Sequence, residues 1–204
     1  MSIVLSIVSK DGVPILTYPA KDESVSLISG VFSAINILTT KIGMGSLRQI
    51  ETNKGVALCQ YIGKDKMLIM LITNDIPRKF MSVIFYLTAK EIEEFADLIE
   101  AGTPLTKSFI AKFETKLNRI FYKINELVEH LKKLERAYLK LREIFGVEAD
   151  RLIVELCKYI EIKNGKMLVN VKLLRKENVT IDLFLGYIKD CENDIKREVR
   201  RLLL

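Results

Sequence analysis

The sequence has no tryptophan, one histidine, three cysteines and four prolines in 204 residues. The single histidine, His130, has no second histidine or nearby cysteine with which it could share a metal ion. Cys59, Cys157 and Cys191 lie far apart, without the close spacing of metal or redox motifs. An odd number of scattered cysteines is typical of a reduced chain, so we predict free thiols and a cytoplasmic protein.

Long apolar runs are also missing. The longest is MLIMLI, residues 67–72, whereas a helix that spans a bilayer needs about 20 apolar residues. The first residues, MSIVLSIVSKDG, lack the basic start and the small-residue cleavage site of a signal peptide. Apolar residues make up 49% of the chain, which is enough to bury a core of its own.

Catalytic motifs are absent from the sequence. The stretch GMGSLRQIETNKG, residues 43–55, places two glycines around one residue, as loops that bind phosphate do. Such loops follow a strand and precede a helix, because the free N–H groups of the helix N-terminus bind the anion. Here the predicted order is helix, glycines, strand, so we interpret the glycines as a tight turn. We expect no catalytic residue, no metal site and no cofactor.

Charge is distributed unevenly. Residues 1–104 hold 10 Lys and Arg against 11 Asp and Glu, and residues 105–204 hold the other 22 against 15. The net charge of +6 therefore belongs to the second half, which predicts two parts, 1–104 and 105–204. A basic half is suited to nucleic acid, anionic lipid or an acidic protein, and it is equally consistent with a solvated helical surface.

The first part begins with a predicted hairpin and helix. Two β-rich runs flank residues 10–12, Lys-Asp-Gly, which is a strong hairpin signal. Residues 22–43 form an amphipathic helix, ended by Gly43. Its apolar stripe, expected to face the core, is Ile28, Val31, Ile35, Leu38 and Ile42. The opposite face is rich in small residues, Ser26, Ser29, Gly30 and Ser33, with Ile37. That face is either solvated or approached closely by another backbone.

Three strands and a helix follow. The strands are SLRQIET, VALCQYIG and KMLIMLIT, with turns at 53–55 and 63–65. The third strand is continuously apolar and is expected at the centre of the sheet. From Phe80 the apolar spacing changes to that of a helix, which ends near Gly102. The predicted fold class is α+β, with a five-stranded antiparallel sheet in the order β-β-α-β-β-β-α.

This order, together with SKDGVPILTY, LISGVFSAINILTTKIGMGSLRQIET and MLIMLITND, resembles the longin-like proteins of archaea, relatives of the roadblock and profilin-like domains. FIAKFETKLNRIF, residues 109–121, resembles their final helix, so the resemblance covers about residues 1–121. It implies a non-enzymatic platform for small GTPases, for trafficking partners or for dimerisation. It also implies a partner surface on the first helix and the adjacent third strand. The candidates there are Ser29, Gly30, Ser33, Ile37, Leu47 and Ile50, although Leu47 and Ile50 also suit an ordinary core.

A long heptad helix is predicted over residues 105–145. Its two heptad positions are Ile110, Leu117, Ile124, Leu131, Tyr138 and Phe145, and Phe113, Ile120, Leu127, Leu134 and Leu141. Five successive heptads favour a coiled-coil seam. Such a seam needs a cover, which is another copy in a homodimer, the C-terminal helix folded back, or a different protein. Extra apolar residues at Phe121 and Val128 favour a bundle.

After Gly146 we predict a short helix over 147–159, a hairpin over 159–174 with Asn164-Gly165 at its turn, and a terminal helix over 179–204. The terminal helix ends in a basic patch, Lys196, Arg197, Arg200 and Arg201, which suits the helix dipole and is also able to meet anionic lipid. Helix, helix and hairpin have the layout of a winged helix. The proposed groove-reading helix is acidic, however, with Glu148, Asp150 and Glu155, whereas a reading helix should be basic or rich in amides.

The leading hypothesis is a cytoplasmic longin-like adaptor or scaffold that binds a protein partner, a small GTPase or trafficking component, and oligomerises through its long helix. The alternative is a nucleic-acid-binding protein that acts through its basic half. A third hypothesis is peripheral contact of the last helix with a membrane.

Overall fold

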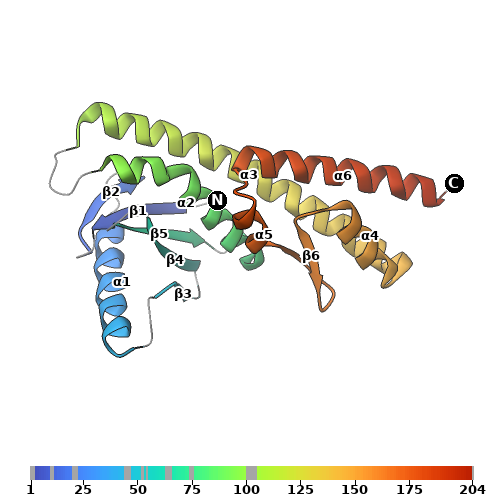
Figure 1. The fold of residues 1–204 in the computed structure, drawn as a ribbon, viewed down its shortest axis with the longest axis horizontal. Coiled ribbons are helices and arrows are strands. Elements are labelled where there is room, and N and C mark those ends of the chain that lie inside the picture. The colour runs from blue at the N-terminus through green and yellow to red at the C-terminus, as the bar shows by residue number, and fades with distance from the viewer. Residues whose placement is uncertain are drawn as a thin grey trace. The chain divides into compact units, whose positions relative to one another are not determined.

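The computed structural model of the protein describes residues 3–9, 12–19, 23–43, 47–51, 53, 55–62, 66–73, 76–99 and 105–203. The chain forms two compact units with the elements shown in Figure 1. Unit 1 is Met1–Pro77 with Thr88–Arg119, and unit 2 is Arg78–Leu87 with Ile120–Leu204. The protein is α+β, with one five-stranded sheet, one separate hairpin and a long helix.

Unit 1 contains an antiparallel sheet in the order β2-β1-β5-β4-β3. Its strands are β1 (Ile3–Ser9), β2 (Pro14–Tyr18), β3 (Gln49–Glu51), β4 (Gly55–Ile62) and β5 (Lys66–Thr73). The continuously apolar strand β5 lies at the centre, as predicted, because both of its faces are covered. Pro14 begins the edge strand β2, where a missing N–H leaves no ladder bond unmade.

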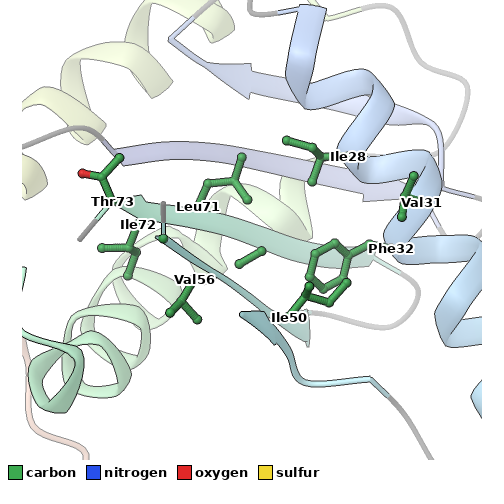
Figure 2. A pocket seen from close by; sticks show the side chains of 10 residues that line it. Ile28, Val31, Phe32, Ile50, Val56, Leu71, Ile72 and Thr73 are labelled. Atoms are coloured by element: carbon green, nitrogen blue, oxygen red, sulfur yellow. The ribbon is translucent and has the colours of Figure 1, made fainter. Parts of the chain in front are cut away.

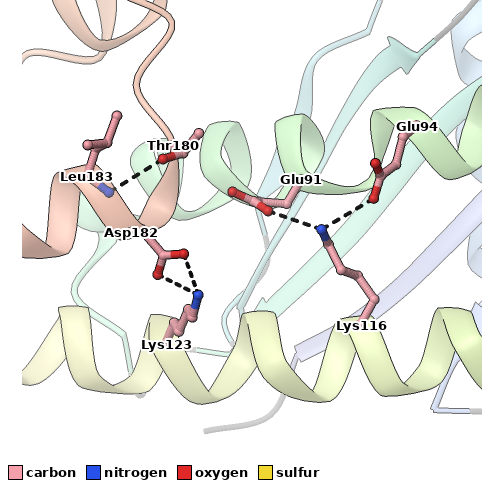
Figure 3. Close-up of polar contacts among 7 residues, drawn as sticks. All are labelled: Glu91, Glu94, Lys116, Lys123, Thr180, Asp182 and Leu183. Carbon is pink, nitrogen blue, oxygen red and sulfur yellow. Dashed lines mark hydrogen bonds and ion pairs between the residues drawn. The ribbon is translucent and has the colours of Figure 1, made fainter.

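Three helical segments complete unit 1: α1 (Glu23–Lys41), the second half of α2 (Arg78–Leu98) and the start of α3 (Lys107–Phe145). Lys116 of α3 lies 3.4 Å from Glu91 and 3.3 Å from Glu94 of α2 (Figure 3). The ring of Phe95 meets those of Phe109 and Phe113 edge to face. The element order β1, β2, α1, β3, β4, β5, α2 confirms the predicted order β-β-α-β-β-β-α.

Helix α1 packs on the sheet with the face opposite to the predicted one. Its buried residues include Phe32, Ser29, Ser33 and Asn36, and Phe32 belongs to a cluster with residues of β1, β4 and β5. From the expected core stripe, Val31, Leu38 and Ile42 are instead exposed, and Ile28 and Ile35 are partly exposed. The apolar period of the sequence therefore located the helix correctly but predicted the wrong buried face.

The small residues of α1 explain this orientation. Gly12, in the β1–β2 turn at a φ of +84°, lies so close to Ser33 that an added Cβ would come within 2.4 Å of the serine Cβ. A larger side chain at residue 33 or 12 would push the turn and the helix apart. The close backbone approach that the serines suggested is made by the chain's own hairpin.

We expect Gly12→Ala to lower the free energy of unfolding by about 2 kcal/mol or more, because it adds positive-φ strain to a steric clash. Ser33→Ala is the matched control. The buried Ser33 hydroxyl has no hydrogen-bond partner among the described residues, so its removal should cost less than about 0.5 kcal/mol or stabilise slightly. Urea unfolding of both variants measures the difference. Equal losses would contradict the close approach.

The free thiol of Cys59 is buried beneath α1, in the same cluster as Phe32. Burial raises the pKa of this thiol to about 11, because a thiolate is poorly solvated there. Its Sγ lies 2.8 Å from the carbonyl oxygen of Leu47 and donates to it. Cys59 is therefore protonated at neutral pH and shielded from reagents.

Unit 2 contains the longer part of α3, the start of α2 and the C-terminal elements. These are α4 (Glu148–Leu156), β6 (Ile160–Lys163), β7 (Lys166–Val169), α5 (Val171–Lys176) and α6 (Ile181–Leu203). The positive φ of Asn164 and Gly165 forms the tight turn of the predicted hairpin β6–β7. The prediction of strand to residue 174 was wrong, since Asn170 accepts a hydrogen bond from the Leu173 N–H and caps α5.

The heptad seam of α3 is buried within the single chain. Its buried members are Phe113, Leu117, Ile120, Ile124, Leu127, Leu131, Leu134, Tyr138 and Leu141, and Ile110 and Phe145 are partly buried. In unit 2, α6 runs parallel to α3 and is joined to it by polar pairs, Lys123 with Asp182 (Figure 3) and His130 with Glu192. In unit 2 the cover observed is the chain's own last helix, and in unit 1 α2 packs against the seam through Phe95 and Phe113. The seam therefore gives no reason for a coiled-coil dimer.

The prediction of reduced thiols was wrong for one pair. Cys157, at the end of α4, and Cys191, in α6, form a disulfide with a Cα–Cα distance of 5.3 Å. The hairpin and α5 reverse the chain between them, so residues 34 positions apart meet. Sequence spacing alone carried no sign of this pairing.

Candidate functional site

Helix α1 presents exposed apolar side chains to solvent. Val31 is 48% exposed, Leu38 59% and Ile42 60%, and at 100° per residue these three share one stripe. Ile37 is 46% exposed, but it lies about 100° or more around the helix from this stripe. We call Val31, Leu38 and Ile42 the α1 apolar surface. Single exposed apolar residues are common, whereas a contiguous exposed set is a candidate site of interaction.

A cavity of about 350 Å³ adjoins this surface in unit 1 (Figure 2). Val31 belongs to both, and Ile28 and Phe32 of α1 line the same wall. The opposite wall comes from β3, β4 and β5, as Ile50, Gly55, Val56, Ala57, Leu71, Ile72 and Thr73. Among the residues that the structure describes, no charged side chain lines the cavity. It therefore suits an apolar side chain of a partner rather than a substrate that must be oriented by polar groups.

Strand β3 borders the site and lies at the edge of the sheet. It has three residues, of which Gln49 and Glu51 are exposed and Ile50 is partly buried. Its outer side pairs with no other strand in the ranges that the structure describes. An open edge offers backbone N–H and C=O groups to an added strand.

Asn36 fixes the helix against the sheet at this site. Its side-chain amide donates to the Tyr61 hydroxyl at 3.0 Å, and its Oδ1 accepts from the Leu47 N–H at 2.8 Å. The buried amide of Asn36 thereby joins α1 to strand β4 and to the segment that precedes β3. Sequence reasoning missed Asn36, although an amide between Phe32 and Thr40 on a helix face was a usable signal.

The structure places the predicted partner residues at three levels of burial. Ser29 and Ser33 are buried, where Ser33 faces the hairpin turn, and Gly30 is exposed beside open space. Leu47 and Ile50 are partly buried and pack against the core cluster. Ile37 is exposed. The accessible apolar residues Val31, Leu38 and Ile42 were missed because the same stripe had been taken as the buried face.

The basic C-terminal patch is partly neutralised by neighbours on α6. Arg197 pairs with Asp194, and Arg201 pairs with Glu198. Lys196 and Arg200 have no ion pair within the part of the chain that the structure describes. The free positive charge of this helix end is therefore carried by two residues rather than four.

The winged-helix layout is not supported by its charges. Asp150 of α4 accepts a hydrogen bond from Tyr138 at 2.8 Å and lies 3.3 Å from Arg142. Burial and this carboxylate raise the pKa of Tyr138 to about 12. On the hairpin, Lys163 pairs with Glu161 at 2.9 Å. The predicted reading helix is acidic and part of the wing's charge is paired, so no observation favours a nucleic-acid groove here.

Two other kinds of site are absent from the described ranges. No group of three or more His, Cys, Asp or Glu side chains is placed to hold a metal ion there. None of the described helices combines the length and the apolar character that crossing a bilayer requires.

No protein-family model matches the chain. Among solved structures, it is similar to a roadblock/LC7 domain from Streptomyces avermitilis, with a TM-score of 0.39 and 15% identity over 46% of this chain and 84% of that one. It is also similar to Myxococcus xanthus MglB, with a TM-score of 0.38 and 14% identity over 47% and 84%. MglB with a tetrameric arrangement matches with a TM-score of 0.37 and 11% identity over 47% and 77%.

Proposed function

We propose that the protein is a non-enzymatic, longin-like adaptor that binds a protein partner through the α1 apolar surface and the open edge of β3. The observation that carries the proposal is the exposure of Val31, Leu38 and Ile42 beside an apolar cavity. Burying exposed apolar area is the main favourable contribution to protein association. The neighbouring strand edge supplies directional hydrogen bonds.

The partner that we propose is a small GTPase, because the resemblance of the sequence to longin-like proteins implies that class of partner. A trafficking component and a second copy of the chain are the other partners that the resemblance implies. The archaeal type belongs to the same proposal. So does a cytoplasmic location, although the Cys157–Cys191 disulfide removes two of the reduced thiols from which it was inferred.

The test is a pair of charge substitutions in the stripe, Leu38→Asp and Ile42→Asp in one variant. Both side chains are exposed, so the fold should survive, as circular dichroism checks. We expect the affinity for a small GTPase from the same genome to fall about tenfold or more, because each aspartate would be desolvated at the interface. Leu98→Asp is the matched control, since Leu98 is 69% exposed in the same unit, on α2.

Light scattering on the same variants separates binding of a second copy of the chain from binding of a GTPase. A dimeric wild-type chain that becomes monomeric with the double substitution would identify the partner as a second copy. If neither self-association nor binding of any GTPase differs between the stripe variant and Leu98→Asp, the proposed function is wrong.

A further inference from the structure

Unit 2 has a second apolar groove, between the C-terminal turns of the parallel helices α3 and α6. Its volume is about 410 Å³. Ala137, Leu141 and Ile144 line it from α3, and Ile195 and Val199 line it from α6. Leu141 and Ile195 are buried at its floor, whereas Ile144 is 66% exposed at its rim. The proposed function does not use this groove, whose lining residues all belong to unit 2.

Every charged side chain among the described residues of the groove's lining is a cation. They are Lys140 on α3 and Lys196 and Arg200 on α6, so the positive charges flank the apolar floor on both sides. All three are exposed, and none has a carboxylate within ion-pair distance in the described part of the chain. By contrast, the adjacent Arg197 and Arg201 are each paired with an acid on α6. Three unpaired like charges around an apolar floor favour an anionic, apolar occupant.

We propose that this groove binds an acidic amphipathic helix of a partner protein. From Ala137 to Ile144 the wall rises over seven residue steps, which is about two helical turns or 10 Å. That length matches the i, i+4, i+7 anchors of a helix laid in a groove. Acidic residues beside the anchors would then meet the cations of both walls.

A second copy of the chain does not fit this groove. A two-fold contact places the same surface on both subunits, so Lys140, Lys196 and Arg200 would face their own copies. Like charges brought together in this way oppose association, most strongly at low salt. Charge complementarity therefore selects a different, acidic chain.

The probe for the test is a synthetic fluorescent peptide with leucines at i, i+4 and i+7 and glutamates at the flanking positions. Fluorescence anisotropy with the full chain should show saturable binding that weakens as salt is raised. Lys196→Glu with Arg200→Glu should weaken binding about tenfold or more. Lys133→Glu with Lys172→Glu, two exposed sites in the same unit that do not line the groove, changes the net charge equally and should leave affinity within about twofold.

Ile144→Asn tests the apolar contribution to binding. It should also weaken binding, because the Ile144 side chain supplies apolar area to the peptide. Since this side chain is exposed, its replacement should change the stability of the fold little. Equal effects of the two charge variants would show non-specific attraction and overturn the proposal. The absence of binding at peptide concentrations of about 1 mM would also overturn the proposal. Equal affinity for the same peptide with lysines in place of glutamates would do the same. The protein is also sedimented with phosphatidylserine vesicles. Co-sedimentation that the peptide does not inhibit would identify a lipid surface as the occupant, which also overturns the proposal.

Discussion

Reduction of the Cys157–Cys191 disulfide is expected to lower the free energy of unfolding of unit 2 by about 4 kcal/mol. The bond joins the end of α4 to α6 across a sequence separation of 34 residues. In the chain-entropy model, closing a loop of this length removes conformational freedom mainly from the unfolded chain. A loss of that size is a large share of the stability of a typical domain.

The measurement is urea unfolding of the wild-type chain with and without a thiol reductant, beside the double variant Cys157→Ser/Cys191→Ser. The variant should unfold near the reduced wild-type chain and should not respond to the reductant. Cys59 provides an internal reference, because its buried thiol with a raised pKa should resist alkylation in the native state. Alkylation of two cysteines in the native, unreduced protein would show that the bond is not formed.

The second large effect is expected at the centre of α3. Leu127→Ala should lower the free energy of unfolding by about 3 kcal/mol, within the usual range of 2–5 for a fully buried leucine. Leu127 is 0% exposed, so truncation leaves a cavity between the packed elements of unit 2. Thermal or urea unfolding followed by circular dichroism measures the change.

Leu139→Ala is the matched control on the same helix. Leu139 is 46% exposed, so its truncation should cost less than about 1 kcal/mol. Because the seam is covered within the chain, the loss for Leu127→Ala should not depend on protein concentration. A midpoint that rises with concentration would show that the seam is shared between chains.

Several elements followed from local sequence patterns. The turns at Gly12, Gly43 and Asn164-Gly165 each need positive φ, which these residue types adopt at low cost. The apolar run of β5 and the heptads of α3 gave the central strand and the longest helix. Such features depend on residues that are neighbours in sequence, and a single chain displays them.

Features that depend on tertiary packing were not predicted. The stripe of α1 has the right period, but burial was decided by Ser33, whose small size admits the turn at Gly12. The pairing of Cys157 with Cys191 depends on how α5 and the hairpin reverse the chain. The predicted partner residues differ from the accessible residues of α1 for the same reason. Which residues are accessible depends on which side of α1 meets the sheet.

The sharing of α2 and α3 between the two units limits modularity. Each helix begins in one unit and ends in the other, so the chain passes between the units inside both helices as well as at Pro77–Arg78, just before α2. Truncation after residue 104 would remove the buried side chains Phe113 and Leu117 from unit 1. It would also leave the start of α2 without the rest of unit 2. The two halves of the gene therefore do not encode independently folding domains. A recombination event near the midpoint of the gene would disrupt the packing of both protein products.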